Sequence, residues 1–278
     1  MTTTKYPVVL LAGGVSKNWQ EGTGGVKLFT RLGKRQLWEY LAQALVESGS
    51  VSRIALVAPP CVLEKLVAAF TAYMALITPQ GVKTLHVQAV PATGDMSDSA
   101  WLGVQALGRP EQVLFICDDL PLLTGTGLQD FLAHCAILQG NGFYPLVREK
   151  LCREQYPKLH RTFFTLREGR FTGGNLVLMQ SKFIPSVLNL AAQVFILRKS
   201  PFKLAAFLGP SFCLKFVLGR LSLTDIEKRV SELAGFTAKS VLSEYPEVAE
   251  DLDNVQDIEA AAFYAAKRAL PKITLSPG

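Results

Sequence analysis

Short apolar runs alternate with amphipathic segments along the first half of the chain. Residues 7–12 form a continuous apolar run, which is typical of a strand buried on both faces of a parallel sheet. Residues 36–47 follow with leucines and aromatic side chains at helical spacing. The same alternation predicts strands at 53–58, 84–90, 112–117 and 142–147, and helices at 62–76, 97–107 and 127–138. Repeated units of this length predict an α/β fold with a doubly wound, mostly parallel, Rossmann-like sheet.

The pattern changes after residue 147. Residues 148–172 are rich in Arg, Lys and Glu, and we expect them to cross over the functional site. Further strands are predicted at 171–179 and 239–245, and helices within 182–219 and at 223–233 and 254–270. We therefore predict one domain over residues 1–278, with residues 182–235 as a helical insertion in its C-terminal half.

Composition limits the classes of protein to which the chain can belong. At 278 residues with 49% hydrophobic side chains, the chain is large and apolar enough for one sizeable α/β core. The formal charge of +6 suits an anionic small substrate, and the sequence has no dense basic run or aromatic-basic motif of a nucleic-acid binder. The five cysteines are scattered and lack C-x-x-C spacing, which predicts reduced thiols and no zinc site. A homo-oligomer is compatible with this composition.

We expect a cytoplasmic protein without a membrane-spanning segment. The first apolar run is short and is broken by glycines, unlike a signal peptide. The longest uncharged stretches, 66–82 and 183–197, are interrupted by Pro, Gln, Thr or Asn.

The first strand is predicted to end in a glycine-bearing loop. Gly13 and Gly14 lack Cβ atoms, so the backbone there can approach a phosphate closely. Lys27 can supply a mobile cation to phosphates during group transfer. The loop has neither a Walker ending nor G-x-G-x-x-G spacing. An ordinary turn with solvated lysines is the alternative interpretation.

Two groups of aspartates are candidates for holding a metal ion. Asp118 and Asp119 follow a predicted strand directly, and Mg²⁺ usually takes one or two carboxylates together with phosphate oxygens. Asp251, Asp253 and Asp257 precede the last predicted helix and can supply a second carboxylate. Helix capping is the alternative interpretation for both groups.

These motifs together resemble the MobA-like nucleotidyltransferases, which have a GT-A-type nucleotide-binding fold. Leu11-Ala12-Gly13-Gly14 matches the opening motif of that family, Val26-Lys27 its Pro-Lys, and Leu32-Gly33-Lys34 its L-x-G-K. Asp119-Leu120-Pro121 matches D-x-P, and residues 252–257 resemble V/I-D-T-P-E-D. Residues 172–175 resemble a T-G-G-N segment found in a subset of the family.

The resemblance implies a magnesium-dependent nucleotidyltransferase that joins an NTP to a phosphorylated small-molecule acceptor and releases pyrophosphate. It implies that Asp119 and Asp253 hold Mg²⁺ and that Lys27 is catalytic. The implied nucleotide-binding residues are Leu11, Ala12, Gly13, Gly14, Lys17, Lys27, Gly94 and Ser97, and the implied acceptor-binding residues are Gly173, Gly174 and Asn175.

Three departures leave a second interpretation open. Asn18 stands where the family usually has a triphosphate-binding arginine, Val26 replaces a proline, and Val255-Gln256 replaces Pro-Glu. The alternative is therefore a catalytically degenerate nucleotide-binding protein of the same fold.

The basic and apolar segment 198–220 has no match in these motifs. It can form the core of the insertion, cover the acceptor site, form a dimer interface or touch a membrane surface.

Overall fold

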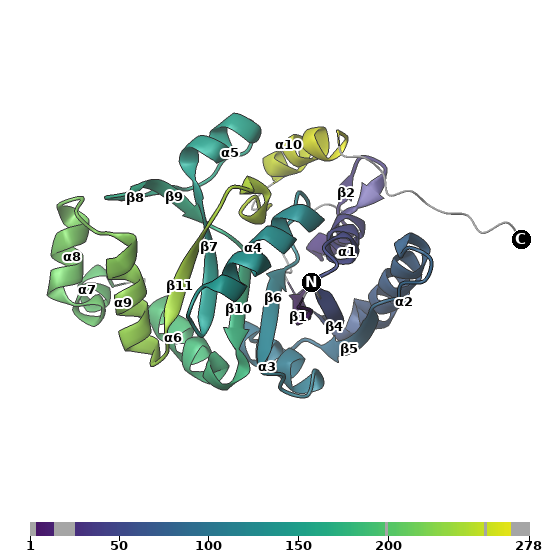
Figure 1. Ribbon diagram of the computed structural model, residues 1–278, viewed down its shortest axis with the longest axis horizontal. Coiled ribbons are helices and arrows are strands. Elements are labelled where there is room, and N and C mark those ends of the chain that lie inside the picture. The colour runs from purple at the N-terminus through teal and green to yellow at the C-terminus, as the bar shows by residue number, and fades with distance from the viewer. Residues whose placement is uncertain (1–3, 14–25, 198–199, 253–254, 268–278) are drawn as a thin grey trace, which may run out of the picture.

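A nine-stranded sheet with helices on both faces forms the centre of the molecule (Figure 1). The structure is a computed structural model, and it describes residues 4–13, 26–197, 200–252 and 255–267. The strand order is β5-β4-β1-β6-β10-β7-β9-β8, and β11 pairs with β7. The bounds of these strands are β1 Tyr6–Leu11, β4 Val51–Ala58, β5 His86–Pro91, β6 Gln112–Cys117, β7 Gly142–Arg148, β8 Phe164–Leu166, β9 Gly169–Gly173, β10 Leu176–Gln180 and β11 Ala238–Ser243. A separate hairpin is formed by β2 Arg31–Leu32 and β3 Arg35–Gln36.

The half of the sheet around β1 is parallel, which confirms the predicted doubly wound α/β fold. β1 lies between β4 and β6, and all three strands run in the same direction. Val8 and Leu10 belong to the core on one face, whereas Val9 belongs to the core on the other. Because both faces are covered, consecutive positions of β1 must be apolar.

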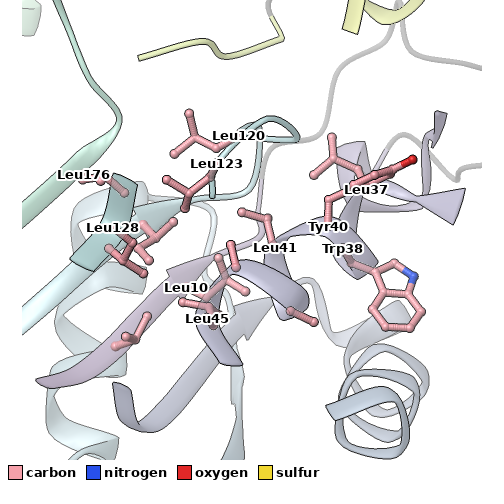
Figure 2. Close-up of a cluster of buried hydrophobic side chains, with 14 of the residues drawn as sticks. Leu10, Leu37, Trp38, Tyr40, Leu41, Leu45, Leu120, Leu123, Leu128 and Leu176 are labelled. Carbon is pink, nitrogen blue, oxygen red and sulfur yellow. The ribbon is translucent and has the colours of Figure 1, made fainter. Parts of the chain in front are cut away.

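Two layers of helices cover the faces. Helices α1 (Leu37–Glu47), α2 (Pro60–Ile77) and α4 (Gly125–Ile137) pack on one face, and α3 (Met96–Ala106) and α6 (Ile184–Leu197) pack on the other. α1 begins with a capping box, in which Gln36 and Glu39 satisfy each other's backbone N–H groups. Figure 2 shows Leu41 and Leu45 of α1 close to Leu10 of β1.

Only one face of helix α2 packs into the core. By length and composition this helix is apolar enough to cross a membrane. Its buried residues recur at helical spacing, and α2 packs against α1, β4 and β5. They are Leu63, Leu66, Phe70 and Met74.

The second half of the sheet departs from the parallel pattern. β10 runs antiparallel between β6 and β7, and β9 continues antiparallel along β7. Gly173 of β9 pairs with Leu146 of β7, whereas Leu178 of β10 pairs with Phe143 of β7. The pairing register with β7 therefore shifts by two residues between Gly173 and Leu178. The intervening Gly174-Asn175 forms an irregularity of the bulge type, which turns side chains away from the regular alternation.

Helices fill the sequence between β10 and β11. After η2 (Ser181–Phe183) and α6 come α7 (Pro201–Leu208), α8 (Pro210–Val217) and α9 (Leu223–Ala234). The remaining elements are η1 (Lys27–Phe29), α5 (Glu149–Gln155), η3 (Pro246–Val248) and α10 (Val255–Ala265). After this helical segment, β11 returns the chain to the central sheet beside β7.

Candidate active site

A cavity of about 290 Å³ opens at the carboxyl ends of the parallel strands. Ligands of doubly wound sheets bind at this edge, because the loops that leave the strands converge there. The cavity is lined by residues at or just after the carboxyl ends of β1, β4, β5 and β6, together with Lys27 of η1 and two residues of α3. The lining residues are Leu11, Gly13, Lys27, Val57, Ala92, Thr93, Gly94, Met96, Ser99, Cys117, Asp118 and Asp119.

Lys27 and Asp119 form an ion pair at this cavity. Lys27 Nζ lies 3.2 Å from Asp119 Oδ2 and donates a hydrogen bond to Leu252 O at 2.8 Å. The side chains of Lys27 and Asp119 are only 14% and 15% exposed, so water screens the pair less than it screens a surface pair. The pair places a cation and a carboxylate at the predicted phosphate site.

Helix capping does not explain the two aspartates after β6. The N-cap of α4 is Thr124, whose hydroxyl accepts a hydrogen bond from Gly127 N. Asp118 is 4% exposed, and both aspartates line the cavity. The capping alternative for Asp118 and Asp119 was therefore wrong.

Asn175 connects Asp119 to a second acidic residue. Its Nδ2 donates to Asp119 Oδ1 at 3.2 Å and to Asp251 Oδ2 at 2.7 Å. The Gly174-Asn175 irregularity brings this side chain to the end of β6, where Cys117 N donates to Asn175 O. Asn175 is thus next to the predicted metal-binding carboxylate as well as within the predicted acceptor motif.

Arg161 was not singled out from the sequence. It forms an ion pair with Asp251, and its Nη2 donates to Gly173 O at 3.3 Å. Its side chain is only 10% exposed, although it comes from the charged crossing segment 148–172. The only indication of Arg161 in the sequence was the prediction that this segment crosses the site. That prediction does not distinguish Arg161 from the other arginines of the segment.

The acidic loop after η3 is held against Asp119. Leu252 N donates to Asp119 O at 3.0 Å, and Asn175 N donates to Val248 O at 3.2 Å. Backbone hydrogen bonds therefore bring the C-terminal motif to the end of β6, as the motif order predicted.

Cys117 lines the cavity as a neutral thiol. Burial, together with the neighbouring Asp119 and Asp118 carboxylates, raises the pKa of Cys117 to about 12, although Lys27 acts in the opposite direction. Only a thiolate is a strong nucleophile, so covalent catalysis by Cys117 is disfavoured near neutral pH.

The other predicted nucleotide residues have different positions. Leu11, Gly13 and Gly94 line the cavity, and Ala12 is buried with its N–H donating to Val57 O. Ser97 lies outside that lining, because its N–H is held by the Asp95 N-cap of α3 while Ser99 faces the cavity. The remaining predicted site residues, Gly14, Lys17 and Asp253, lie outside the described residues.

No group of three or more His, Cys, Asp and Glu side chains among the described residues is arranged to hold a metal ion. Mg²⁺ at a phosphate site needs only one or two carboxylates, since phosphate oxygens and water complete its coordination. The carboxylate of Asp119 has the hard oxygen atoms that this ion prefers, so this residue is compatible with Mg²⁺.

Comparisons with known proteins bear on the family and the fold of this chain. A profile of the MobA-like NTP transferase domain matches residues 8–199. A structure described as a hypothetical transferase from Thermus thermophilus has a TM-score of 0.73 and 30% identity, covering 92% of this chain and 100% of that one.

A curated relative, 2-C-methyl-D-erythritol 4-phosphate cytidylyltransferase from Corynebacterium glutamicum, is 29% identical over 133 residues. That match covers 46% of this chain and 50% of the relative, so the chain spans about half the length of the curated relatives it matches. The structure of 4-diphosphocytidyl-2C-methyl-D-erythritol synthase from Anaerococcus prevotii shares the fold, with a TM-score of 0.57 and 13% identity over 95% of this chain and 99% of that one.

Proposed function

This chain belongs to the MobA-like NTP transferase family, and from that membership we propose that it is a magnesium-dependent nucleotidyltransferase. It would join an NTP to a phosphorylated small-molecule acceptor and release pyrophosphate. The observation that carries the proposal is the contact of Lys27 Nζ with Asp119 Oδ2 and Leu252 O at the strand-end cavity.

The reaction forms one phosphorus–oxygen bond and breaks another. A phosphate oxygen of the acceptor attacks the α-phosphorus of the NTP, and the bond from that phosphorus to the α,β-bridging oxygen breaks. The electron pair leaves on pyrophosphate. Because the acceptor phosphate is already ionised at neutral pH, it needs no general base. Catalysis then depends on alignment of the reactants and on neutralisation of charge.

Lys27 is the residue that would neutralise this charge. Its ammonium group lies at the edge of the cavity, where it can approach the α-phosphate and the leaving pyrophosphate. Backbone around Gly13 would lie against the triphosphate, since a glycine there leaves room for phosphate oxygens. The neutral Cys117 thiol would take no part in proton transfer.

Asp119 and Asp253 would hold Mg²⁺. When bound, the ion would contact phosphate oxygens and offset their negative charge. Asn175 supports this assignment for Asp119, because its amide fixes one carboxylate oxygen by donating to Oδ1. A fixed carboxylate loses little freedom when it binds a ligand.

CTP and a polyol phosphate are the first substrates to test. The curated relatives are named as cytidylyltransferases that act on 2-C-methyl-D-erythritol 4-phosphate, and the fold alone does not select a base or an acceptor. The alternative is a degenerate protein that binds the nucleotide without turnover, as the replacement of the family arginine by Asn18 suggests.

The test is a thermal-shift panel of ATP, CTP, GTP and UTP, each with and without Mg²⁺. A ligand at about a hundred times its dissociation constant adds roughly 2.7 kcal/mol of stability. We expect a magnesium-dependent shift with one NTP that is lost in Asp119→Asn and kept in Asp130→Asn, a control on α4 outside the cavity lining.

Pyrophosphate release is then measured with the selected NTP and a panel of sugar and polyol phosphates. Release that needs both substrates and Mg²⁺ would support the enzyme. Nucleotide binding without release for any acceptor would favour the degenerate protein, and no shift with any NTP would contradict a preformed nucleotide site.

A further inference from the structure

The net positive charge of the chain is concentrated in the helical insertion. The insertion, residues 182–235, contains eight basic and three acidic residues, so it carries +5 of the formal net charge of +6. Its three acidic residues, Asp225, Glu227 and Glu232, all lie after residue 224. The basic residues before them are Lys182, Arg198, Lys199, Lys203, Lys215 and Arg220.

An exposed apolar strip lies within the same segment. Residues 214–220, which we call the α8 strip, have the sequence LKFVLGR, and all seven are exposed. Phe216 and Val217 are 59% and 79% exposed, and Leu214 and Leu218 are 60% and 55% exposed. The strip is therefore not part of the core of the insertion, which was one of the alternatives for segment 198–220.

The α8 strip has a defined shape. Gly219 has a φ of 62°, and Arg220 N donates to Lys215 O at 2.7 Å, which closes the end of α8 in a helix-capping turn. Lys215 is also held by Asp225, with 2.6 Å between Lys215 Nζ and Asp225 Oδ1. In Figure 1, α8 is at the outer left end of the molecule, beyond α9 and away from the central strands.

Exposed apolar side chains beside basic ones suit the boundary between lipid headgroups and acyl chains. The apolar groups leave water there, and the basic groups stay among anionic headgroups. A symmetric contact with a second copy is less favourable, because it would bring two positively charged segments together.

We propose that the α8 strip binds the surface of an anionic lipid bilayer. Phe216 and Val217 would enter the headgroup boundary, while Arg220 and Lys203, which are both exposed, would face the anionic headgroups. Each basic residue near such a surface is worth roughly a five-fold change in partitioning, and salt screens this part of the attraction. The inference is independent of the proposed reaction, because the strip lies outside the strand-end cavity.

The experiment is co-sedimentation of the full chain with two kinds of vesicle, phosphatidylcholine alone and phosphatidylcholine mixed with phosphatidylserine, at low and high salt. Phe216→Ser combined with Val217→Ser removes the apolar contact, and Lys203→Glu combined with Arg220→Glu reverses the charge. The matched controls are Ile137→Ser, at a side chain that is 80% exposed on α4, and Lys83→Glu, at an exposed residue between α2 and β5. Thermal melts verify that each variant is folded.

We expect binding to the anionic vesicles that weakens with salt. It should fall at least ten-fold in both strip variants and stay unchanged in both controls. Absence of binding to anionic vesicles at low salt would overturn the proposal, and so would equal losses in the controls. A dimer in analytical ultracentrifugation that is lost in the Phe216/Val217 variant would also overturn it, because the strip would then be covered by a second copy.

Discussion

Lys27 Nζ lies 3.2 Å from Asp119 Oδ2, although 92 residues separate the two in the chain. The contact joins the loop after β1 to the loop after β6, which are neighbouring strands of the sheet. It therefore places the principal cation of the proposed reaction beside the principal carboxylate.

Replacement of Lys27 by methionine should abolish most of the turnover. Loss of one charge-stabilising group lowers kcat by roughly 10²- to 10³-fold in comparable sites. Pyrophosphate release under saturating substrates measures the effect. The control is Lys83→Met, at an exposed lysine outside the cavity lining, and wild-type turnover in Lys27→Met would contradict the assigned role.

Asn175→Ala should destabilise the fold by about 2 to 4 kcal/mol. The substitution removes two hydrogen bonds to carboxylates and leaves Asp119 and Asp251 without the amide that separates their charges. Urea unfolding measures the change, with Asn189→Ala as a control at an exposed residue of α6.

Asn175→Asp tests the electrostatic part of that role. A third carboxylate at this position should destabilise more than alanine at pH 7, and part of the loss should be recovered on acidification as protonation removes the repulsion. If the aspartate variant were as stable as the wild type at pH 7, the bridging role of the amide would be wrong.

Much of this site follows from the order of motifs in the sequence. The apolar run before Gly13 and the run before Asp118 both read as buried parallel strands, and loops at the carboxyl ends of parallel strands meet. The meeting of Lys27 with Asp119 is thus a consequence of local patterns and a general rule of sheet topology. The family membership was likewise predictable from these motifs and is confirmed by the profile match.

The position of Asn175 could not be obtained in that way. Its contacts depend on β10 lying antiparallel between β6 and β7, and on the two-residue register shift between Gly173 and Leu178, within which Asn175 lies. Strand order and register are long-range properties, and neither apolar periodicity nor turn residues at 173–174 specify them. The pairing of Arg161 with Asp251 was hidden for the same reason, since it joins two segments of unrelated local pattern.

Gly174→Ala should destabilise the protein by roughly 1 to 3 kcal/mol, because a Cβ there would lie 2.7 Å from Val248 O and 2.8 Å from Pro145 Cγ. The backbone oxygen cannot move without loss of the hydrogen bond from Asn175 N. Gly94→Ala is the matched control, since a Cβ at Gly94 meets nothing within 4 Å. Thermal melts of both variants measure the difference, and equal melting temperatures would contradict the close packing at Gly174.

Stability should depend on pH through Glu250, which is 1% exposed. Burial raises the pKa of this carboxyl from 4.5 to about 7, although the Cys152 thiol and Arg161 act in the opposite direction. A raised folded-state pKa means that the native state binds the proton more tightly than the unfolded chain. Ionisation of Glu250 therefore lowers the free energy of unfolding. This destabilisation is absent below pH 4.5, grows up to about pH 7 and is complete above it.

Glu250→Gln should therefore stabilise the protein at pH 8, by at most about 3 kcal/mol, and the gain should vanish near pH 4.5. Urea midpoints measured across this range give the comparison. Glu154→Gln, at a side chain that is 57% exposed, should change stability by less than about 0.5 kcal/mol at every pH. A gain for Glu250→Gln that is constant with pH would contradict the ionisation argument.

The hydrogen bond from Lys27 Nζ to Leu252 O joins residues 225 positions apart. Formation of this contact closes a very long loop of the chain. Loop closure costs conformational entropy, so the contact stabilises the protein only after the intervening segments have folded. The strand-end cavity should accordingly be among the last parts of the molecule to form during folding. A chain still emerging from the ribosome would have the glycine loop and β6 long before it had the segment that completes them, so nucleotide binding would report on the finished fold.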